Sequence, residues 1–205
     1  MTQAKLNLVS FDEFIAWYPE NSEWHYELHK GVIVEIPKPK GQHSQIAGFL
    51  CLELGLQCKA NKFSCLIPKE SVVKPFREES GYEPDVIVLN RLAIPKEPRW
   101  AAESIITMGE SIRVIVEVVS TNWRDDYLTK LADYEQMGIP EYWIVDYLGL
   151  GGRAFIDKPK QPTLSIYRLV DGEYEVSQFR GNSLLESPAF PELNLTAEQV
   201  FKAGV

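Results

Sequence analysis

The feature that most constrains the fold is a nearly continuous run of β-branched residues from Ile112 to Val119. Such runs are typical of strands covered on both faces, as in parallel sheets. A second strand is predicted from Glu141 to Tyr147. The segment between them carries helix signals, namely a capping residue, two acids for the positive end of the helix dipole and a stop, at Asn122, Asp125, Asp126, Gly138 and Pro140. Strand, helix and strand in this order predict a right-handed crossover with parallel pairing of the two strands.

Shorter patterns predict the other elements. They are a helix from Ser10 to Tyr18 with a Ser10/Glu13 capping box, a hairpin from His25 to Ile36, a helix from about His43 to Lys59, strands at Phe63–Ile67, Ser71–Lys74 and Asp85–Leu89, a charged loop from Asn90 to Glu110, a hairpin of Leu164–Val170 and Tyr174–Phe179, and a last helix capped by Thr196. The apolar stripe of the helix from 43 to 59 is imperfect and consists of Ile46, Phe49, Leu50, Leu54 and Gln57. We therefore expect one mixed α/β domain over residues 1–205, with a core at about 26–147 and a β-rich C-terminal extension at about 150–205.

The charge is unevenly distributed along the chain. The whole sequence carries −8 with a pI of about 5.0, which argues against binding nucleic acid through overall positive charge. The stretch from Lys38 to Arg77 nevertheless carries +5, because seven basic residues (38, 40, 59, 62, 69, 74 and 77) stand against the two acids Glu53 and Glu70. This stretch suits a phosphate-bearing substrate, and a solvated lysine-rich surface is the alternative.

Three cysteines, Cys51, Cys58 and Cys65, are spaced seven residues apart without a CxxC pair, so we expect no structural metal site. Cys51 and Cys58 are predicted to lie on one helix as buried apolar residues. The N-terminus lacks the features of a signal peptide, and no apolar run approaches the roughly 20 residues of a membrane helix. We therefore expect a cytoplasmic protein without a membrane span.

Two acids occupy positions where a strand is normally apolar. Asp85 opens EPDVIVL, and Glu117 lies inside VIVEVV on the same face as Ile115 and Val119. An unpaired carboxylate there is penalised or neutralises itself through a raised pKa. If the two strands are neighbours, the acids repel each other by about 4 kcal/mol at about 4 Å and an effective dielectric of about 20. Mg²⁺ or Mn²⁺ turns that repulsion into attraction, so the pattern predicts a divalent metal site.

Each acid alone also has a structural explanation. Asp85 follows a proline and suits a turn at the start of a strand. Glu117 could form a buried ion pair with Arg113 or Lys130. The two explanations stay open at this point, because sequence spacing does not show which residues meet across the sheet.

The helix after the buried strand carries a polar stripe. Asp126, Lys130 and Tyr134 are spaced i, i+4, i+8 and share one face. A lysine directed at the sheet can place a positive charge on a phosphate and on the attacking water. The alternative is an Asp126–Lys130 pair on the surface, which contributes a few tenths of a kcal/mol.

These residues resemble a known superfamily. Pro84-Asp85, followed about thirty residues later by Glu117-Val118-Val119, resembles the PD-(D/E)XK nuclease signature. The run VIVEVVSTNWRDDYLTKLADYEQMGIPEYWIVD, residues 114–146, more specifically resembles the Uma-two family of restriction-endonuclease-like proteins, as do Tyr26-Glu27-Leu28, Gly31 and His43. The resemblance covers about residues 10 to 147. It implies a restriction-endonuclease-like αβββαβ core with a mixed central sheet flanked by helices.

The resemblance also implies a metal-dependent nuclease in which Asp85, Glu117 and the backbone carbonyl of Val118 hold Mg²⁺ or Mn²⁺. The sequence departs from the superfamily signature at Val119, which stands in place of the signature lysine. The family carries a lysine on the following helix, which points to Lys130 as the third catalytic residue. Residues expected to border the site are Glu27, His43, Asp126 and Tyr134. A buried structural role is equally open for His43.

We therefore expect hydrolysis of phosphodiester bonds in nucleic acid, with DNA favoured over RNA. Substrate contacts are predicted for Arg99, Trp100 and Arg124. The main rival is a nucleic-acid-binding protein without turnover on a nuclease fold, which the substitution at Val119 leaves open. A second rival is an assembly module that uses the aromatic residues Trp17, Trp24 and Trp100. A homodimer suits an enzyme that cuts two strands, but the sequence does not decide the oligomeric state.

Overall fold

The computed structural model describes residues 8–19, 24–76 and 79–204, so the first seven residues and Arg77 of the basic stretch lie outside the described residues. The elements are α1 (Phe11–Trp17), β1 (His25–His29), β2 (Val32–Ile36), α2 (Gly41–Ala60), β3 (Cys65–Leu66), β4 (Val72–Val73), β5 (Val86–Asn90), the 3₁₀ turn η1 (Ile94–Lys96), α3 (Trp100–Glu103), β6 (Ile105–Ile106), the 3₁₀ turn η2 (Gly109–Ser111), β7 (Ile112–Val118), the π-helix η3 (Asp125–Lys130), α4 (Leu131–Gln136), β8 (Glu141–Asp146), α5 (Arg153–Ile156), β9 (Thr163–Val170), β10 (Glu173–Phe179) and α6 (Ala197–Lys202).

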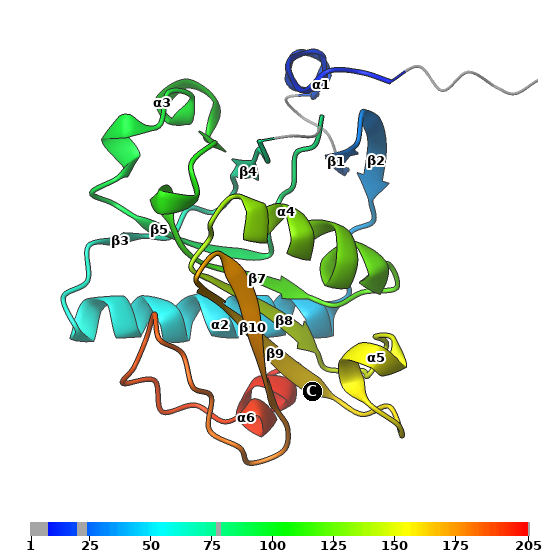
Figure 1. Cartoon of the computed structure of the whole chain (residues 1–205), viewed down its shortest axis with the longest axis vertical. Helices are drawn as coiled ribbons and strands as arrows, with labels where there is room; N and C mark the ends of the chain where they lie inside the picture. The colour runs from blue at the N-terminus through cyan, green and yellow to red at the C-terminus, as the bar shows by residue number, and fades with distance from the viewer. Residues whose placement is uncertain (1–7, 20–23, 77–78, 205) are drawn as a thin grey trace, which may run out of the picture.

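A six-stranded mixed sheet forms the centre, in the order β10-β9-β8-β7-β5-β3 (Figure 1). β7 and β8 pair in parallel, and the other neighbours pair antiparallel. The predicted strand–helix–strand unit is thus confirmed, as is the C-terminal hairpin. The hairpin was expected as an extension of the core. Its strand β9 pairs along the whole of β8, so the hairpin continues the central sheet.

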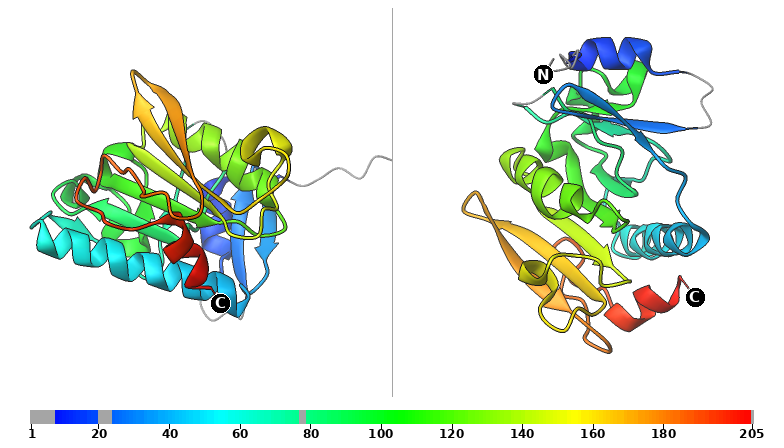
Figure 2. Two further views of the ribbon diagram at one scale, coloured as in Figure 1. Left: turned by 90° about the horizontal axis from the view of Figure 1, so that it is seen from below. Right: turned by 90° about the vertical axis from the view of Figure 1, so that its right-hand side faces the viewer.

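Helices cover both faces of this sheet (Figure 2). α2 and α6 pack on one face, and η3 with α4 packs on the other. The alternation predicted for β7 is confirmed, because Val114, Val116 and Val118 face α2 while Ile115 and Val119 face α4. The mixed α/β architecture therefore follows from one strand that buries both of its faces.

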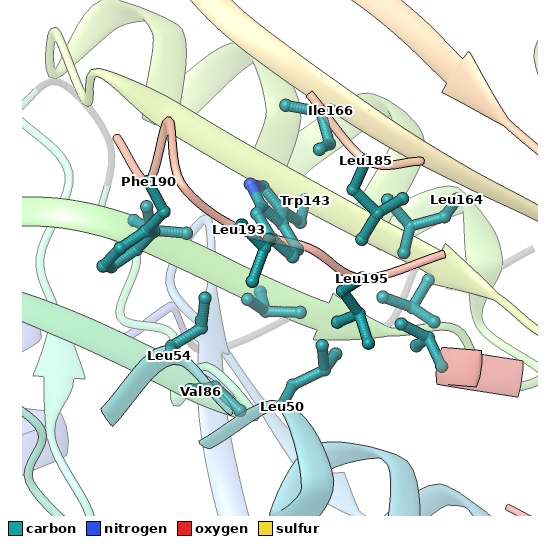
Figure 3. Packing of buried hydrophobic residues seen from close by; sticks show 14 of the residues in the cluster. Leu50, Leu54, Val86, Trp143, Leu164, Ile166, Leu185, Phe190, Leu193 and Leu195 are labelled. Carbon is teal, nitrogen blue, oxygen red and sulfur yellow. The ribbon is translucent and has the colours of Figure 1, made fainter. Parts of the chain in front are cut away.

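The core against α2 is filled by aliphatic side chains and by phenylalanines such as Phe190, around one tryptophan (Figure 3). Trp143 of β8 is fully buried, with Leu185 and Leu193 of the C-terminal segment on one side and Leu50 and Leu54 of α2 nearby. Burial of each such side chain contributes about 1.5–3 kcal/mol. The C-terminal residues after β10 thus complete the main core.

A smaller unit packs at the N-terminal side of the molecule. It joins α1 to the hairpin of β1 and β2 through the buried residues Phe11, Phe14 and Leu28. The predicted capping box is confirmed, because Ser10 and Glu13 bond each other's backbone N–H groups. The predicted hairpin is also confirmed, with its turn at Lys30-Gly31.

Several boundaries differ from the predictions. α2 begins at Gly41, and its buried positions are His43, Ile46, Leu50, Leu54 and Cys58, so Gln57 does not belong to the stripe. β4 pairs with β6 inside the predicted charged loop and lies outside the central sheet. The helical segment after β7 begins at Trp123, immediately after Asn122 as predicted, and is wound as a π-helix from Asp125; the carbonyl of Asn122 accepts from the N–H of Asp125.

The cysteines also differ in part. Cys58 and Cys65 form a disulfide, and Cys51 is free and half-buried. Cys51 and Cys58 do lie on one helix, as predicted. Among the described residues, no helix is both long and apolar enough to cross a bilayer.

Candidate functional site

The pairing of β5 with β7 brings the two predicted acids together. Val86 pairs with Val116, so Asp85, immediately before β5, lies beside Glu117 of β7. Both residues line one cavity of about 250 Å³. Glu117 is 3% exposed, and the side chain of Asp85 is 24% exposed. The buried acid and the accessible acid therefore share one opening to solvent.

Val118 connects these acids to α2 through its backbone. Oδ2 of Asp85 accepts a hydrogen bond from the N–H of Val118 at 2.7 Å. The carbonyl of Val118 accepts a hydrogen bond from Nε2 of His43 at 2.8 Å. Val118 still pairs with β8, but the pairing with β5 ends at Val116, so on that side its N–H and carbonyl bond side chains.

Lys130 lies between the acids. Its Nζ is 3.0 Å from Oε1 of Glu117, 2.9 Å from Oε1 of Glu27 and 3.9 Å from Oδ1 of Asp126. The hydroxyl of Tyr134 donates to the same Glu117 oxygen at 3.2 Å. Of the two ion pairs open for Glu117, the structure shows the one with Lys130. It also excludes a surface pair with Asp126, because Lys130 is 5% exposed.

Arg113 lies away from this cluster. Its guanidinium donates to the carbonyl of Ala189 and lies over the ring of Phe63, 4.0 Å from the centroid. The second ion pair proposed for Glu117 is therefore not formed.

The polar stripe after β7 is wound as a π-helix from Asp125 to Lys130 and continues as α4. Asp126, Lys130 and Tyr134 are all buried and all face the sheet. A π-turn closes an i→i+5 bond and is wider than an α-turn, so residues four apart lie more nearly above one another. Single π-turns occur often at functional sites, because they direct neighbouring side chains to one place.

Burial and mutual repulsion shift the pKa values of these acids. Burial raises the pKa of Glu117 well above its ordinary value, and Asp85 adds to this effect while Lys130 opposes it. Burial likewise raises the pKa of Asp126 to about 7. Burial works to lower the pKa of Lys130, but the surrounding carboxylates outweigh it and raise that pKa. One lysine therefore serves as counterion for several crowded carboxylates.

Glu27 holds Lys130 from the side of β1. Its Oε1 accepts from Lys130 and from the N–H of Glu83, and its Oε2 is 2.8 Å from Nε2 of His29. Burial works to raise the pKa of Glu27, but Lys130 and His29 outweigh it and lower that pKa to about 2. Sequence reasoning missed His29. The alternation of His25, Glu27 and His29 on one strand face is the signal that could have found it.

The cavity is rich in negative charge. Six carboxylate residues and three lysines line it, which leaves a formal charge of −3 when His43 is neutral. Among the described residues, no three His, Cys, Asp or Glu side chains lie close enough to hold a metal ion by themselves. Asp85 and Glu117 offer the oxygen donors that Mg²⁺ and Mn²⁺ prefer, and the carbonyl of Val118 is beside them. The donor set thus fits a divalent ion if a backbone oxygen takes part.

The residues predicted to contact substrate lie outside this cavity. Arg99 pairs with Asp12 and Glu103, and Trp100 packs against the core on the α4 side. Arg124 is exposed, and its guanidinium lies over the ring of Trp123. Their role in binding stays a prediction.

Asp126→Asn should make the protein more stable at high pH. The folded-state pKa of Asp126, about 7, lies above the ordinary value of 3.8, so the folded chain binds this proton more tightly than the unfolded chain does. Protonation of Asp126 therefore stabilises the folded chain fully below pH 3.8, the ordinary pKa of an aspartate. This stabilisation decreases as the pH rises and is lost above about 7, the pKa in the folded chain. We expect the gain in stability of the asparagine variant over wild type to be larger at about pH 8.5 than at about pH 5 by about 2–3 kcal/mol, because about two pH units separate pH 5 from the folded-state pKa and each contributes about 1.4 kcal/mol.

Urea unfolding without metal at both pH values measures this difference. Asp125→Asn, next in sequence on the first turn of the same π-helix and only half-buried, is the control and should change the stability less than Asp126→Asn does. An Asp126→Asn protein that is less stable than wild type at high pH contradicts the prediction.

Two acids from neighbouring strands, a buried lysine from the following helix and an αβββαβ core define a nuclease-like protein. Residues 11–198 match the Uma2 family, described as "putative restriction endonuclease", and the chain belongs to this family. The fold is also similar to the crystal structure of a "putative nuclease belonging to DUF820 from Anabaena variabilis ATCC 29413". The TM-score is 0.72 at 22% identity, over 96% of this chain and 99% of that chain. No curated protein matches the sequence.

Proposed function

We propose that this protein hydrolyses phosphodiester bonds of nucleic acid in a reaction that depends on Mg²⁺ or Mn²⁺. The observation that carries the proposal is the meeting of Asp85, Glu117 and Lys130 in one cavity. The family to which the chain belongs, and the fold that it shares with the protein from Anabaena variabilis described as a "putative nuclease", support this activity in general terms. DNA is the substrate we favour.

Asp85, Glu117 and the carbonyl of Val118 are the proposed metal ligands. A bound divalent ion polarises the phosphate and lowers the pKa of a water molecule. Without such an ion the cavity repels a phosphate, because its formal charge is already negative. The carboxylates alone therefore cannot bind the substrate.

The protein's own groups have separate roles. Lys130 stabilises the negative charge that develops on the phosphate and orients the attacking water. Glu27 and Tyr134 hold Lys130 and Glu117 in position through hydrogen bonds. Lys38 and Lys40 line the cavity and are exposed, so they are placed to attract the phosphate backbone.

Chelation of the metal should abolish cleavage. We expect the full-length protein to cleave DNA in Mn²⁺ or Mg²⁺ and to lose cleavage by about 10³-fold or more in excess EDTA, since the metal supplies several kcal/mol of transition-state stabilisation. Restoring Mn²⁺ should restore the rate. The measurement is release of fragments from single-stranded DNA, duplex DNA and RNA.

Cleavage that persists in EDTA rules out the metal-dependent mechanism. Binding of nucleic acid without cleavage of any of the three substrates, at any concentration of either ion, favours the rival of a binding protein on a nuclease fold. Light scattering on the same samples tests whether the protein is a homodimer or a larger assembly.

A further inference from the structure

His43 is placed at the cavity by the start of α2. It is the third residue of this twenty-residue helix, whose first turn carries no acid and no side-chain cap. The side chain is 8% exposed and lines the same cavity as Asp85 and Val118. A histidine at this position is thus fixed by the packing of α2 against β7.

Its Nε2 atom lies between two proposed metal ligands. Nε2 is 2.8 Å from the carbonyl oxygen of Val118 and 3.4 Å from Oδ2 of Asp85. Adjacent ligands of an octahedral ion with bonds of about 2.1 Å lie about 3 Å apart. Nε2 is therefore already spaced from each of the other two donor atoms as a neighbouring ligand of one ion would be.

The hydrogen bond to Val118 does not satisfy both nitrogen atoms of this imidazole. Nδ1 is buried and has no hydrogen-bond partner among the described residues. Leaving a buried polar atom unpaired costs about 1–3 kcal/mol. The carbonyl of Val118, which accepts from Nε2, lies at the cavity. A water molecule there could donate to it instead, without leaving a buried nitrogen unpaired.

Side chains alone also leave the predicted ligand set incomplete. Within the described part of the chain, no three candidate ligand side chains form a metal cluster, so a site at Asp85 needs backbone oxygen atoms or water to complete its ligands. Glu117 is held by Lys130 and Tyr134 on its Oε1. Asp85, Val118 and His43, by contrast, contact one another directly.

We propose that His43 coordinates the divalent ion through Nε2, beside Asp85 and the carbonyl of Val118, and that the site therefore prefers Mn²⁺ to Mg²⁺. This inference rests on the proposed function and extends it. Coordination uses the lone pair of Nε2, so the ring proton resides on Nδ1 and the hydrogen bond to Val118 is replaced by a shared bond to the ion. An imidazole nitrogen favours transition-metal ions, whereas an all-oxygen set suits Mg²⁺.

Titration calorimetry with MnCl₂ alone and with MgCl₂ alone tests the proposal. The proteins are the full-length wild type, His43→Gln, Asp85→Asn and the control His25→Gln, whose imidazole is half-exposed and pairs with Glu83. We expect His43→Gln to weaken Mn²⁺ binding by about tenfold or more and Mg²⁺ binding by much less. His25→Gln should behave as wild type, and Asp85→Asn should lose both ions.

Glutamine can still donate to the carbonyl of Val118, so the variant should fold, and thermal unfolding checks this.

A measurement on the wild type needs no variant at all. Electron spin-echo spectroscopy of bound Mn²⁺ should show coupling to an imidazole ¹⁴N nucleus, and His25→Gln should keep that signal while His43→Gln loses it. The chain has three histidines, so the assignment is direct.

If His43→Gln keeps the wild-type Mn²⁺ affinity and Mn²⁺/Mg²⁺ preference, or if the wild type shows no ¹⁴N coupling, His43 is not a ligand. The proposed metal site at Asp85 then still stands. Binding that depends on His43 in a protein that cleaves no nucleic acid supports the ligand and refutes the proposed function. A wild type that binds neither ion refutes both.

Discussion

Glu117→Gln should reduce metal-dependent cleavage by about 10³-fold or more, which corresponds to a loss of about 4 kcal/mol of transition-state stabilisation. Glutamine has nearly the same shape and keeps an oxygen acceptor for Lys130 and Tyr134. It lacks the negative charge that the proposed ion requires. Because burial already raises the pKa of Glu117, removing its charge should not reduce the stability of the fold. Asp85→Asn should have a similar effect on cleavage.

The control for this prediction is Glu141→Gln. Glu141 is also a buried strand glutamate, 1% exposed, but it bonds Ser187 and Trp143 at the other end of β8. Its variant should cleave at the wild-type rate once folding is checked by circular dichroism. Full activity in a folded Glu117→Gln protein would remove Glu117 from the mechanism.

Lys130→Met should lower the free energy of unfolding by about 3–5 kcal/mol in the absence of metal. The substitution keeps the length of the side chain but leaves Glu27, Glu117 and Asp126 buried without their cation. Acid should reduce the loss, because the carboxylates then become neutral by protonation. Mn²⁺ should also recover part of the loss, because an ion that binds only the folded chain stabilises it.

Urea unfolding measures these effects, at about pH 8 and about pH 5 and with and without Mn²⁺. Lys202→Met is the matched control, since Lys202 is exposed and pairs with Glu198 four residues earlier, an interaction that contributes only a few tenths of a kcal/mol. A Lys130→Met protein as stable as wild type would show that the buried carboxylates need no counterion. In either case, cleavage by Lys130→Met reports separately on the proposed role of the lysine at the phosphate.

The sequence predicted the centre of the fold because the pattern there is local and strong. The run from Ile112 to Val119 and the strand from Glu141 both bury two faces, and the connection between them fixes their handedness. The pairing of β4 with β6 was missed, because each strand has only two residues and their contact joins segments far apart in sequence. The pairing of β9 with β8 was missed for a different reason: both strands are long, but the turns between them suggested a separate extension.

The meeting of Asp85 and Glu117 was predicted from their unusual positions in apolar strands. The position of Lys130 was predicted from spacing and from the resemblance to the family. In the structure its Nζ lies 3.0 Å from Oε1 of Glu117. The π-helix could not be predicted, because its residues suit an α-helix equally well and only tertiary packing selects the wider turn. The contacts of Arg99 with Asp12 and Glu103 were likewise beyond a pattern of charges along the chain.

The continuous pairing of β9 along β8 has a consequence for any shortened version of the chain. A fragment that ends near Gly149 would retain every proposed catalytic residue, yet it would expose the apolar edge of β8 and uncover Trp143. Open edges of this kind recruit strands from other molecules. The last quarter of the polypeptide therefore shields the edge of β8 from self-association, and we expect that neither part folds as an independent module.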